Sequence, residues 1–146
     1  MHQHEKANAN DQARGSTNPL ESKPLAGIRV VELGQNIAGP YAGEILAMLG
    51  AQVVKVERPG TGDDARGWGP PFVHGVATTF EAMNHGKQSV TVDLQSPDGM
   101  DWLKQLIAHS DIFLHNMRPG SLDAVGLGAE QVRQQFPSLI YCELGA

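Results

Sequence analysis

The sequence contains a single cysteine, Cys142, so it can form neither an intrachain disulfide nor a CxxC metal or redox pair. Basic residues are also few: 11 Lys and Arg stand against 16 Asp and Glu, for a formal net charge of −5. Nucleic acids and anionic membranes are bound through dense positive charge, so this composition argues against both as partners. No apolar run approaches the roughly 20 residues that cross a bilayer. These absences favour a reduced, cytoplasmic setting.

Residues 1–24 contain one leucine and no aromatic or β-branched aliphatic side chain. Such a segment cannot bury enough apolar surface to offset the entropy lost on ordering, and it lacks the apolar centre of a signal peptide. We therefore expect a flexible polar extension over residues 1–24. The remaining residues, 25–146, are numerous enough to bury a core and form one domain.

Short runs rich in Val or Ile predict five strands, at residues 28–33, 52–57, 89–94, 111–115 and 139–144. Helices are predicted between them, at residues 40–49, 96–109 and 129–135. Because strands alternate with helices and no hairpin-length turn joins them, the pattern predicts an α/β fold with right-handed βαβ units on a parallel sheet.

Two of the predicted helices carry recognisable end signals. The first would end at Gly50, with Ile45, Leu46 and Leu49 sharing one face. The second has Ser96 as its N-cap and proline at its first helical position. The longest irregular stretch, residues 59–76, is rich in Gly and Pro and is expected to be a functional loop.

Ligands of open parallel sheets bind at the carboxyl ends of the strands, which points to the segments at residues 34–40, 58–68, 95–98 and 116–120. Gly34 and Gly39 have the GxxxxG spacing of a phosphate loop. Pro40 and Tyr41 stand where that loop needs Lys and Ser or Thr, which excludes it. A strand followed by glycine and a helix N-terminus can still hold an anion on its backbone amides.

Arginines occur in two of these segments. Arg58 and Arg66 flank the pair Asp63 and Asp64, which is consistent either with local ion pairs in a solvated loop or with Arg58 presenting its guanidinium to a phosphate. Arg118 would place a second arginine at the same edge, which favours a phosphate-bearing ligand. The histidines lack the spacing of metal ligands, so no metal site is expected. No nucleophile with a base can be assembled, so no catalytic residue is predicted.

The residues at these positions also form ordered motifs. The run PLAGIRVVELGQNIAGPYAGEILAMLGAQVVKVERPGTGDDARGWGPP resembles the N-terminal signature of the family III CoA-transferases, which include formyl-CoA transferase, carnitine CoA-transferase and α-methylacyl-CoA racemase. NHGKQS at residues 84–89, VDL at 92–94, SPDG at 96–99 and NMRPG at 116–120 match the same family. The resemblance extends over residues 23–146.

The resemblance implies a Rossmann-like parallel sheet with flanking helices, with residues 25–146 as the incomplete, N-terminal CoA-binding portion of the large domain. It implies that coenzyme A is the ligand, as a substrate, with no metal. The implied CoA-binding residues are Ile37, Ala38, Arg58, Val92, Asp93, Leu94, Gln95, Asn116, Met117 and Arg118. The implied partners are an acyl-CoA, a carboxylic acid and a second subunit in an interlocked homodimer.

Three residues depart from the family pattern: Gln35 stands where Arg or His is common, Gln95 replaces a lysine of formyl-CoA transferases, and Ala124 replaces a frequent arginine. These departures argue against formyl-CoA transferase specifically. The family's nucleophilic aspartate is expected well beyond Ala146. The expected function is CoA transfer through an aspartyl acyl intermediate; the alternatives are an acyl-CoA racemase or isomerase of the same family and a non-catalytic, truncated CoA-binding fragment.

Overall fold

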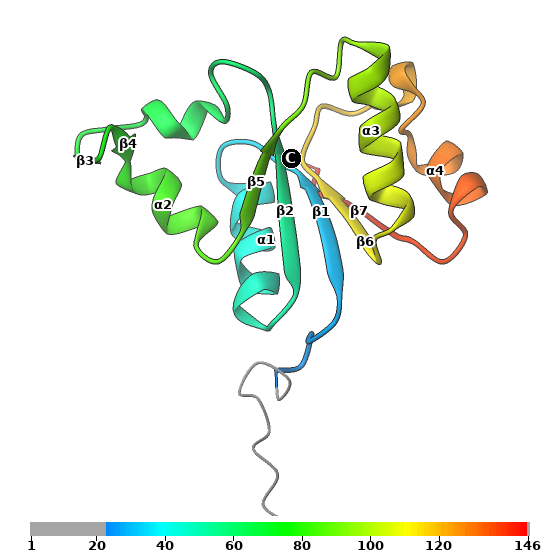
Figure 1. Cartoon of the computed structure of the whole chain (residues 1–146), viewed down its shortest axis with the longest axis horizontal. Coiled ribbons are helices and arrows are strands. Elements are labelled where there is room, and N and C mark those ends of the chain that lie inside the picture. The colour runs from blue at the N-terminus through cyan, green and yellow to red at the C-terminus, as the bar shows by residue number, and fades with distance from the viewer. Residues whose placement is uncertain (1–22, 146) are drawn as a thin grey trace, which may run out of the picture.

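The structure, a computed structural model, describes residues 23–145, so most of the predicted extension over residues 1–24 lies outside the described residues. Its centre is a parallel sheet with the strand order β5-β2-β1-β6-β7 (Figure 1). The strands are β1 (Arg29–Leu33), β2 (Gln52–Glu57), β5 (Gln88–Thr91), β6 (Ile112–His115) and β7 (Ile140–Glu143). The predicted α/β fold with a parallel sheet is confirmed.

The sheet is doubly wound from its central strand. From β1 the chain moves outward on one side through β2 and β5, then returns to the other side of β1 to form β6 and β7. Helices α1 (Ala38–Met48) and α2 (Thr78–Asn84) lie on one side of the sheet, and α3 (Pro97–Ala108) and α4 (Ala129–Gln135) on the other (Figure 1). The direction in which successive strands are added to the sheet therefore reverses between β1 and β6, the position where open α/β sheets bind ligands.

The core is split between the two faces of the sheet. Val30 and Val31 are both fully buried but belong to different clusters, because successive side chains of a strand point to opposite faces. Leu103 and Ile107 of α3 complete the larger cluster, as the helical spacing of that segment predicts. The predicted cap is also present, since Ser96 Oγ accepts a hydrogen bond from Gly99 N at 3.0 Å.

Helix α1 differs from its prediction. It begins at Ala38 rather than residue 40, and its buried residues are small: Gly39, Pro40 and Gly43. Of the apolar side chains predicted to share one face, Leu46 packs into the core, whereas Ile45 and Leu49 are 41% and 40% exposed. The helix contacts the sheet closely through its small residues, and Ile45 and Leu49 point away from that contact.

The segment between β2 and β5 is more regular than predicted. The 3-10 helix η1 (Asp64–Gly67), the short strands β3 (Phe72–Val73) and β4 (Val76–Ala77) and the helix α2 all lie there. At its far end β5 stops at Thr91 instead of residue 94, because Ser96 N bonds to Asp93 O and turns the chain into α3. Within residues 23–145, no helix has the length and apolar character needed to span a membrane.

Candidate functional site

β1 and β6 are neighbouring parallel strands, and the order in which strands are added to the sheet reverses between them. Their carboxyl ends therefore lie side by side. Leu33, the last residue of β1, pairs with His115, the last residue of β6. The loops that follow these strands therefore begin side by side, and the loops after β2 and β5 lie next to them on the same edge. All four predicted segments are thus brought to one edge of the sheet, as expected for parallel strands.

Asn116 joins the first and fourth of these loops. Its Oδ1 accepts a hydrogen bond from Gln35 N at 2.8 Å, and its Nδ2 donates to Gln35 O at 2.9 Å. A Cβ added at Gly39 would lie 2.8 Å from Asn116 Oδ1, so only glycine fits there without a shift. The Asn116 side chain is therefore a clamp on the crevice loop, residues 34–38.

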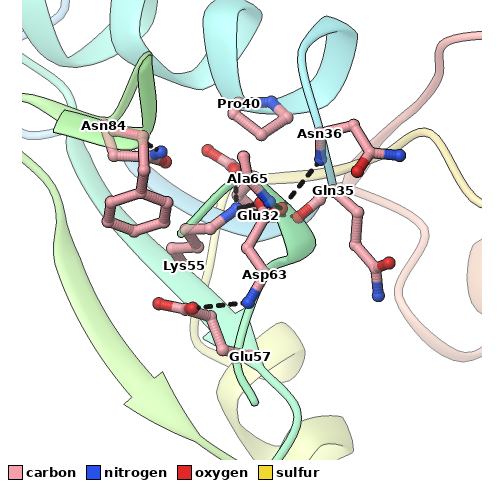
Figure 2. Close-up of polar contacts among 12 residues, drawn as sticks. Glu32, Gln35, Asn36, Pro40, Lys55, Glu57, Asp63, Ala65 and Asn84 are labelled. Carbon is pink, nitrogen blue, oxygen red and sulfur yellow. Dashed lines mark hydrogen bonds and ion pairs between the residues drawn. The ribbon is translucent and has the colours of Figure 1, made fainter. Parts of the chain in front are cut away.

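A cluster of four charged side chains lies beneath this loop. Glu32, Lys55, Asp63 and Lys87 each have a side chain no more than 1% exposed, and their formal charges sum to zero. Figure 2 shows Glu32, Lys55 and Asp63 close together below Gln35 and Asn36. We call these four residues the charge cluster.

Each lysine of the charge cluster has three oxygen partners. Lys55 Nζ lies 3.1 Å from Glu32 Oε1, 2.9 Å from Asp63 Oδ2 and 2.8 Å from Gly34 O. Lys55 thus donates hydrogen bonds to Glu32 and to Gly34 O and forms an ion pair with Asp63, and these contacts offset the cost of burying its charge.

Lys87 is held in the same way. Its Nζ lies 2.7 Å from Glu32 Oε2, 2.6 Å from Pro40 O and 2.8 Å from Asn84 Oδ1. Burial lowers the pKa of Lys87, against the opposing effect of Glu32. The two lysines therefore hold Gly34 O and Pro40 O, one at each end of the turn into α1.

A second polar group anchors the loop after β2. Glu57 accepts two hydrogen bonds from Arg66, each 2.7 Å long, and others from Ser89 Oγ and Asp63 N. Burial acts to raise the pKa of Glu57, but the hydrogen bonds from Arg66, Ser89 and Asp63 outweigh it and lower the pKa to about 2. The guanidinium of Arg66 also stacks on Phe80, 3.8 Å from the ring centre, and so ties α2 to this loop.

Arg58 is exposed and engaged within its own loop. Its Nε donates to Thr61 Oγ1 at 2.8 Å and to Gly62 O at 2.9 Å, and its Nη2 pairs with Asp64. The local ion pair considered from the sequence is therefore present. An open hollow of about 270 Å³ lies alongside, lined in part by Arg58, Arg66 and Thr91.

The other residues predicted to bind CoA differ in how they could meet a ligand. Ile37, Ala38, Asp93, Gln95 and Arg118 are exposed at the crevice edge. Leu94 and Met117 are half-buried and pack against the larger core cluster.

Val92 is the exception among these residues, because its side chain is buried in the core and its N–H donates to Glu57 O at 2.9 Å. A ligand could meet only the remaining backbone of Val92. The assignment of these residues to CoA stays a prediction.

His115 supports the loop after β6 from below. Its Nδ1 accepts a hydrogen bond from Met117 N at 3.3 Å, and its Nε2 lies 2.8 Å from Tyr141 Oη, which in turn donates to Leu127 O at 3.0 Å. Burial lowers the pKa of His115, and burial together with Glu143 raises the pKa of Tyr141 to about 12. Both shifts favour the neutral forms of the two side chains, which hold the loop after β6 through these hydrogen bonds.

A larger hollow lies at the opposite edge of the sheet. It measures about 810 Å³ and is lined by the starts of β1, β2 and β5, including Arg29, Gln52 and Gln88. None of the residues predicted to bind a ligand lines it. Among residues 23–145, no cluster of three or more His, Cys, Asp or Glu side chains could hold a metal ion.

The charge cluster is not identified by the sequence pattern. Asp63 is predicted to belong to a solvated loop, yet it is 2% exposed. A signal is present in β1 and β2, where Glu32 and Lys55 interrupt runs of Val at positions that pair directly across the two strands. A charge inside an apolar strand needs a buried partner, and these two residues supply each other.

Comparison with known proteins gives consistent matches. A family model described as CoA-transferase family III matches residues 25–146. The succinyl-CoA:glutarate CoA-transferase of Mus musculus is 46% identical over 122 residues, which cover 84% of this chain and 28% of that protein. The succinate–glutarate CoA-transferase of Agrobacterium fabrum is 42% identical over 132 residues, covering 86% of this chain and 33% of the relative.

A solved structure matches over the same region. The crystal structure of a CAIB/BAIF family protein from Brucella suis aligns with a TM-score of 0.78 at 45% identity, covering 83% of this chain and 33% of that chain. This chain therefore spans about a third of the length of the proteins it matches.

Proposed function

Because this chain belongs to CoA-transferase family III, we propose that it forms the CoA-nucleotide-binding part of a CoA-transferase. The complete enzyme would move CoA from an acyl-CoA donor to a carboxylic acid acceptor. Relatives named for succinyl-CoA and glutarate make a dicarboxylic acid the first acceptor to assay.

The observation that carries this proposal is the meeting of four loops at one sheet edge, closed by the two hydrogen bonds between Asn116 and Gln35. The carboxyl edge beside β1 and β6, where the strand order reverses, is the general ligand position of a doubly wound sheet. The residues expected from the family to bind CoA lie on these four loops, of which the first and last are joined by Gln35 and Asn116, 81 positions apart in the sequence.

The nucleotide of CoA is strongly anionic, and the site offers two ways to receive it. Arg58 and Arg118 are exposed at this edge, and guanidinium groups bind phosphate oxygens through paired hydrogen bonds. The ion pair of Arg58 with Asp64 is exposed, so exchanging it for a phosphate costs only about 0–1 kcal/mol. The N-terminal end of α1 adds backbone N–H groups beside Ile37 and Ala38.

In this proposal the chain supplies binding rather than the reacting group. An aspartate carboxylate from a later part of a longer chain would attack the thioester carbon, the carbon–sulfur bond would break, and CoA would leave as its thiolate. The acceptor carboxylate would displace the donor acid from the resulting acyl anhydride, and the CoA thiolate would then attack the acceptor's acyl carbon, which forms the new thioester and releases the aspartate carboxylate. A second subunit in an interlocked homodimer would complete the acyl pocket.

Calorimetric titration with CoA tests the binding role. We expect CoA to bind and to raise the melting temperature, because a ligand of the folded state stabilises that state. Pantetheine is the matched control ligand, since it carries the thiol arm without the nucleotide, and it should bind far more weakly. Equal binding of both compounds would show that the site does not recognise the nucleotide, and absence of CoA binding would overturn the proposal.

A further inference from the structure

Asn36 holds an uncommon backbone conformation in the crevice loop. Its φ is +65°, in the left-handed region that costs energy for residues other than glycine, although asparagine tolerates it best. The Asn36 side chain is exposed, so packing of that side chain does not hold the conformation. Its backbone N–H donates to Asp63 Oδ1 at 3.0 Å, and this bond connects the loop after β1 to the loop after β2.

The Asp63 carboxylate is itself fixed from several sides. It is 2% exposed, its Oδ1 also accepts from Ala65 N at 2.9 Å, and its Oδ2 lies 2.9 Å from Lys55 Nζ (Figure 2). The same ammonium group donates to Gly34 O at 2.8 Å. Asp63 Oδ1 therefore holds Asn36 while its ion-pair partner Lys55 holds Gly34, on either side of the residue that Asn116 clamps.

We propose that Asp63 is a positioning residue: its carboxylate sets the left-handed turn at Asn36 and so fixes the adjacent Ile37–Ala38 backbone in the geometry that receives CoA. This inference rests on the proposed function. It adds a residue that the family resemblance does not assign to CoA binding and that touches the ligand only through the loop.

The physical reason is preorganisation. Without the carboxylate, Asn36 N loses its acceptor and the strained φ is no longer compensated, so the loop relaxes toward conformations with negative φ. The Ile37–Ala38 backbone then moves relative to Arg58 and Arg118. CoA binding has to restore the turn, and the free energy that this costs lowers the affinity for CoA.

Two substitutions of Asp63 separate the acceptor from the charge. Asp63→Ala removes both, and we expect it to weaken CoA binding at least about tenfold and to speed hydrogen exchange at the Asn36 amide. Asp63→Asn removes the charge but keeps an acceptor oxygen for Asn36 N and Ala65 N, so it should bind CoA within about threefold of the unchanged protein even though it is less stable.

Leu103→Ala is the control for general destabilisation. Leu103 is fully buried in α3, on the face of the sheet opposite to α1, and truncating it leaves a cavity without touching the crevice loop. It should lower the melting temperature and leave the CoA dissociation constant unchanged. A folded Asp63→Ala protein that binds CoA within twofold of the unchanged protein would overturn the positioning role, as would equal weakening by Asp63→Ala and Asp63→Asn.

A second pair of variants tests the same turn if Asp63→Ala does not fold. Asn36→Gly and Asn36→Ala both remove the exposed side chain and keep the N–H, but only glycine accepts φ near +65° without strain. Asn36→Ala should therefore bind CoA several-fold more weakly than Asn36→Gly, and equal affinities would contradict the proposal. If the unchanged protein binds no CoA, both the proposed function and this inference are wrong. If the unchanged protein binds CoA but the affinities of the variants do not follow the stated order, only the positioning role is wrong.

Discussion

Asn116 and Gln35 exchange two hydrogen bonds between the loop after β6 and the loop after β1. Asn116 Oδ1 accepts from Gln35 N at 2.8 Å, and Asn116 Nδ2 donates to Gln35 O at 2.9 Å. An asparagine carboxamide is the shortest side chain that can satisfy both the N–H and the C=O of one residue on a neighbouring loop. The bonds lie beside Gly39, where a larger residue would displace the carboxamide. This arrangement joins the two loops on which the proposed nucleotide site depends.

The first prediction concerns Asn116→Asp, which preserves shape and changes one donor into an acceptor. The bond from Gln35 N is kept, but a carboxylate oxygen now faces Gln35 O, so an attractive contact becomes repulsive. We expect the free energy of unfolding to fall by about 1–3 kcal/mol, measured by urea denaturation, with weaker CoA binding. An unchanged free energy of unfolding would mean that the clamp contributes nothing to stability.

The second prediction concerns Gly43→Ala in α1. Alanine is the better helix former by about 1 kcal/mol, but a Cβ at this position would overlap Glu32 Oε2. Glu32 would have to move away from Lys87, which breaks a buried ion pair, and breaking such pairs typically costs about 3–5 kcal/mol. We therefore expect a net destabilisation of at least about 2 kcal/mol in urea denaturation.

Gly67→Ala is the matched control for that substitution. A Cβ at Gly67 meets nothing within 4 Å, so we expect a change within about 1 kcal/mol. If Gly43→Ala were as harmless as Gly67→Ala, the close contact between α1 and the charge cluster would not matter for stability.

The third prediction uses the lowered pKa of Glu57. Its pKa falls from 4.5 to about 2 in the folded protein, so Glu57 stabilises the fold above pH 4.5 and this contribution is lost as the pH falls from 4.5 toward 2. The shift corresponds to about 3 kcal/mol of stability. Glu57→Gln should remove that part of the pH dependence, so the difference in unfolding free energy between the two proteins should shrink through this pH range. A difference that stays constant with pH would contradict the assignment.

The sheet and the edge where the site lies could be predicted from local features. Short apolar runs mark β2 and β6 within one residue of their observed bounds, and Ser96 and Gly50 mark helix ends. Parallel strands then place the loops after them on a common edge without further information.

The charge cluster could not be predicted in this way. Glu32, Lys55, Asp63 and Lys87 come from four separate segments, and although Glu32 and Lys55 interrupt apolar strands, the sequence does not indicate that Asp63 and Lys87 join them. Their burial follows from the close packing of α1 on the sheet, which depends on Gly39 and Gly43 and on contacts between distant residues. The face of α1 that packs on the sheet could not be predicted either, because its buried residues are Gly39, Pro40 and Gly43. Hydrophobic periodicity identifies a buried helix face by its large apolar side chains.

The fourth prediction concerns Arg58 and its partner Asp64, for which opposite effects are expected. Arg58→Ala removes a guanidinium from the crevice edge and should weaken CoA binding about tenfold or more, the loss typical of one charge-assisted hydrogen bond to phosphate. Asp64→Asn removes the carboxylate that competes with phosphate for Arg58, so it should strengthen CoA binding by a few-fold. Both effects are measured by calorimetric titration.

Arg133→Ala is the control for a general loss of positive charge. Arg133 is exposed on α4, away from the four crevice loops, and its Nε donates only to Ala129 O within its own helix. It carries the same charge as Arg58, so a purely long-range effect would weaken CoA binding equally in both variants and would disappear at high salt, because exposed charges are screened. A contact with phosphate predicts instead that Arg133→Ala binds normally, and that Asp64→Asn has no effect once Arg58 is also replaced by Ala. Strengthening by Asp64→Asn in the absence of Arg58 would show that Asp64 acts by simple repulsion of the ligand, and equal weakening by Arg58→Ala and Arg133→Ala would contradict a direct contact between Arg58 and phosphate.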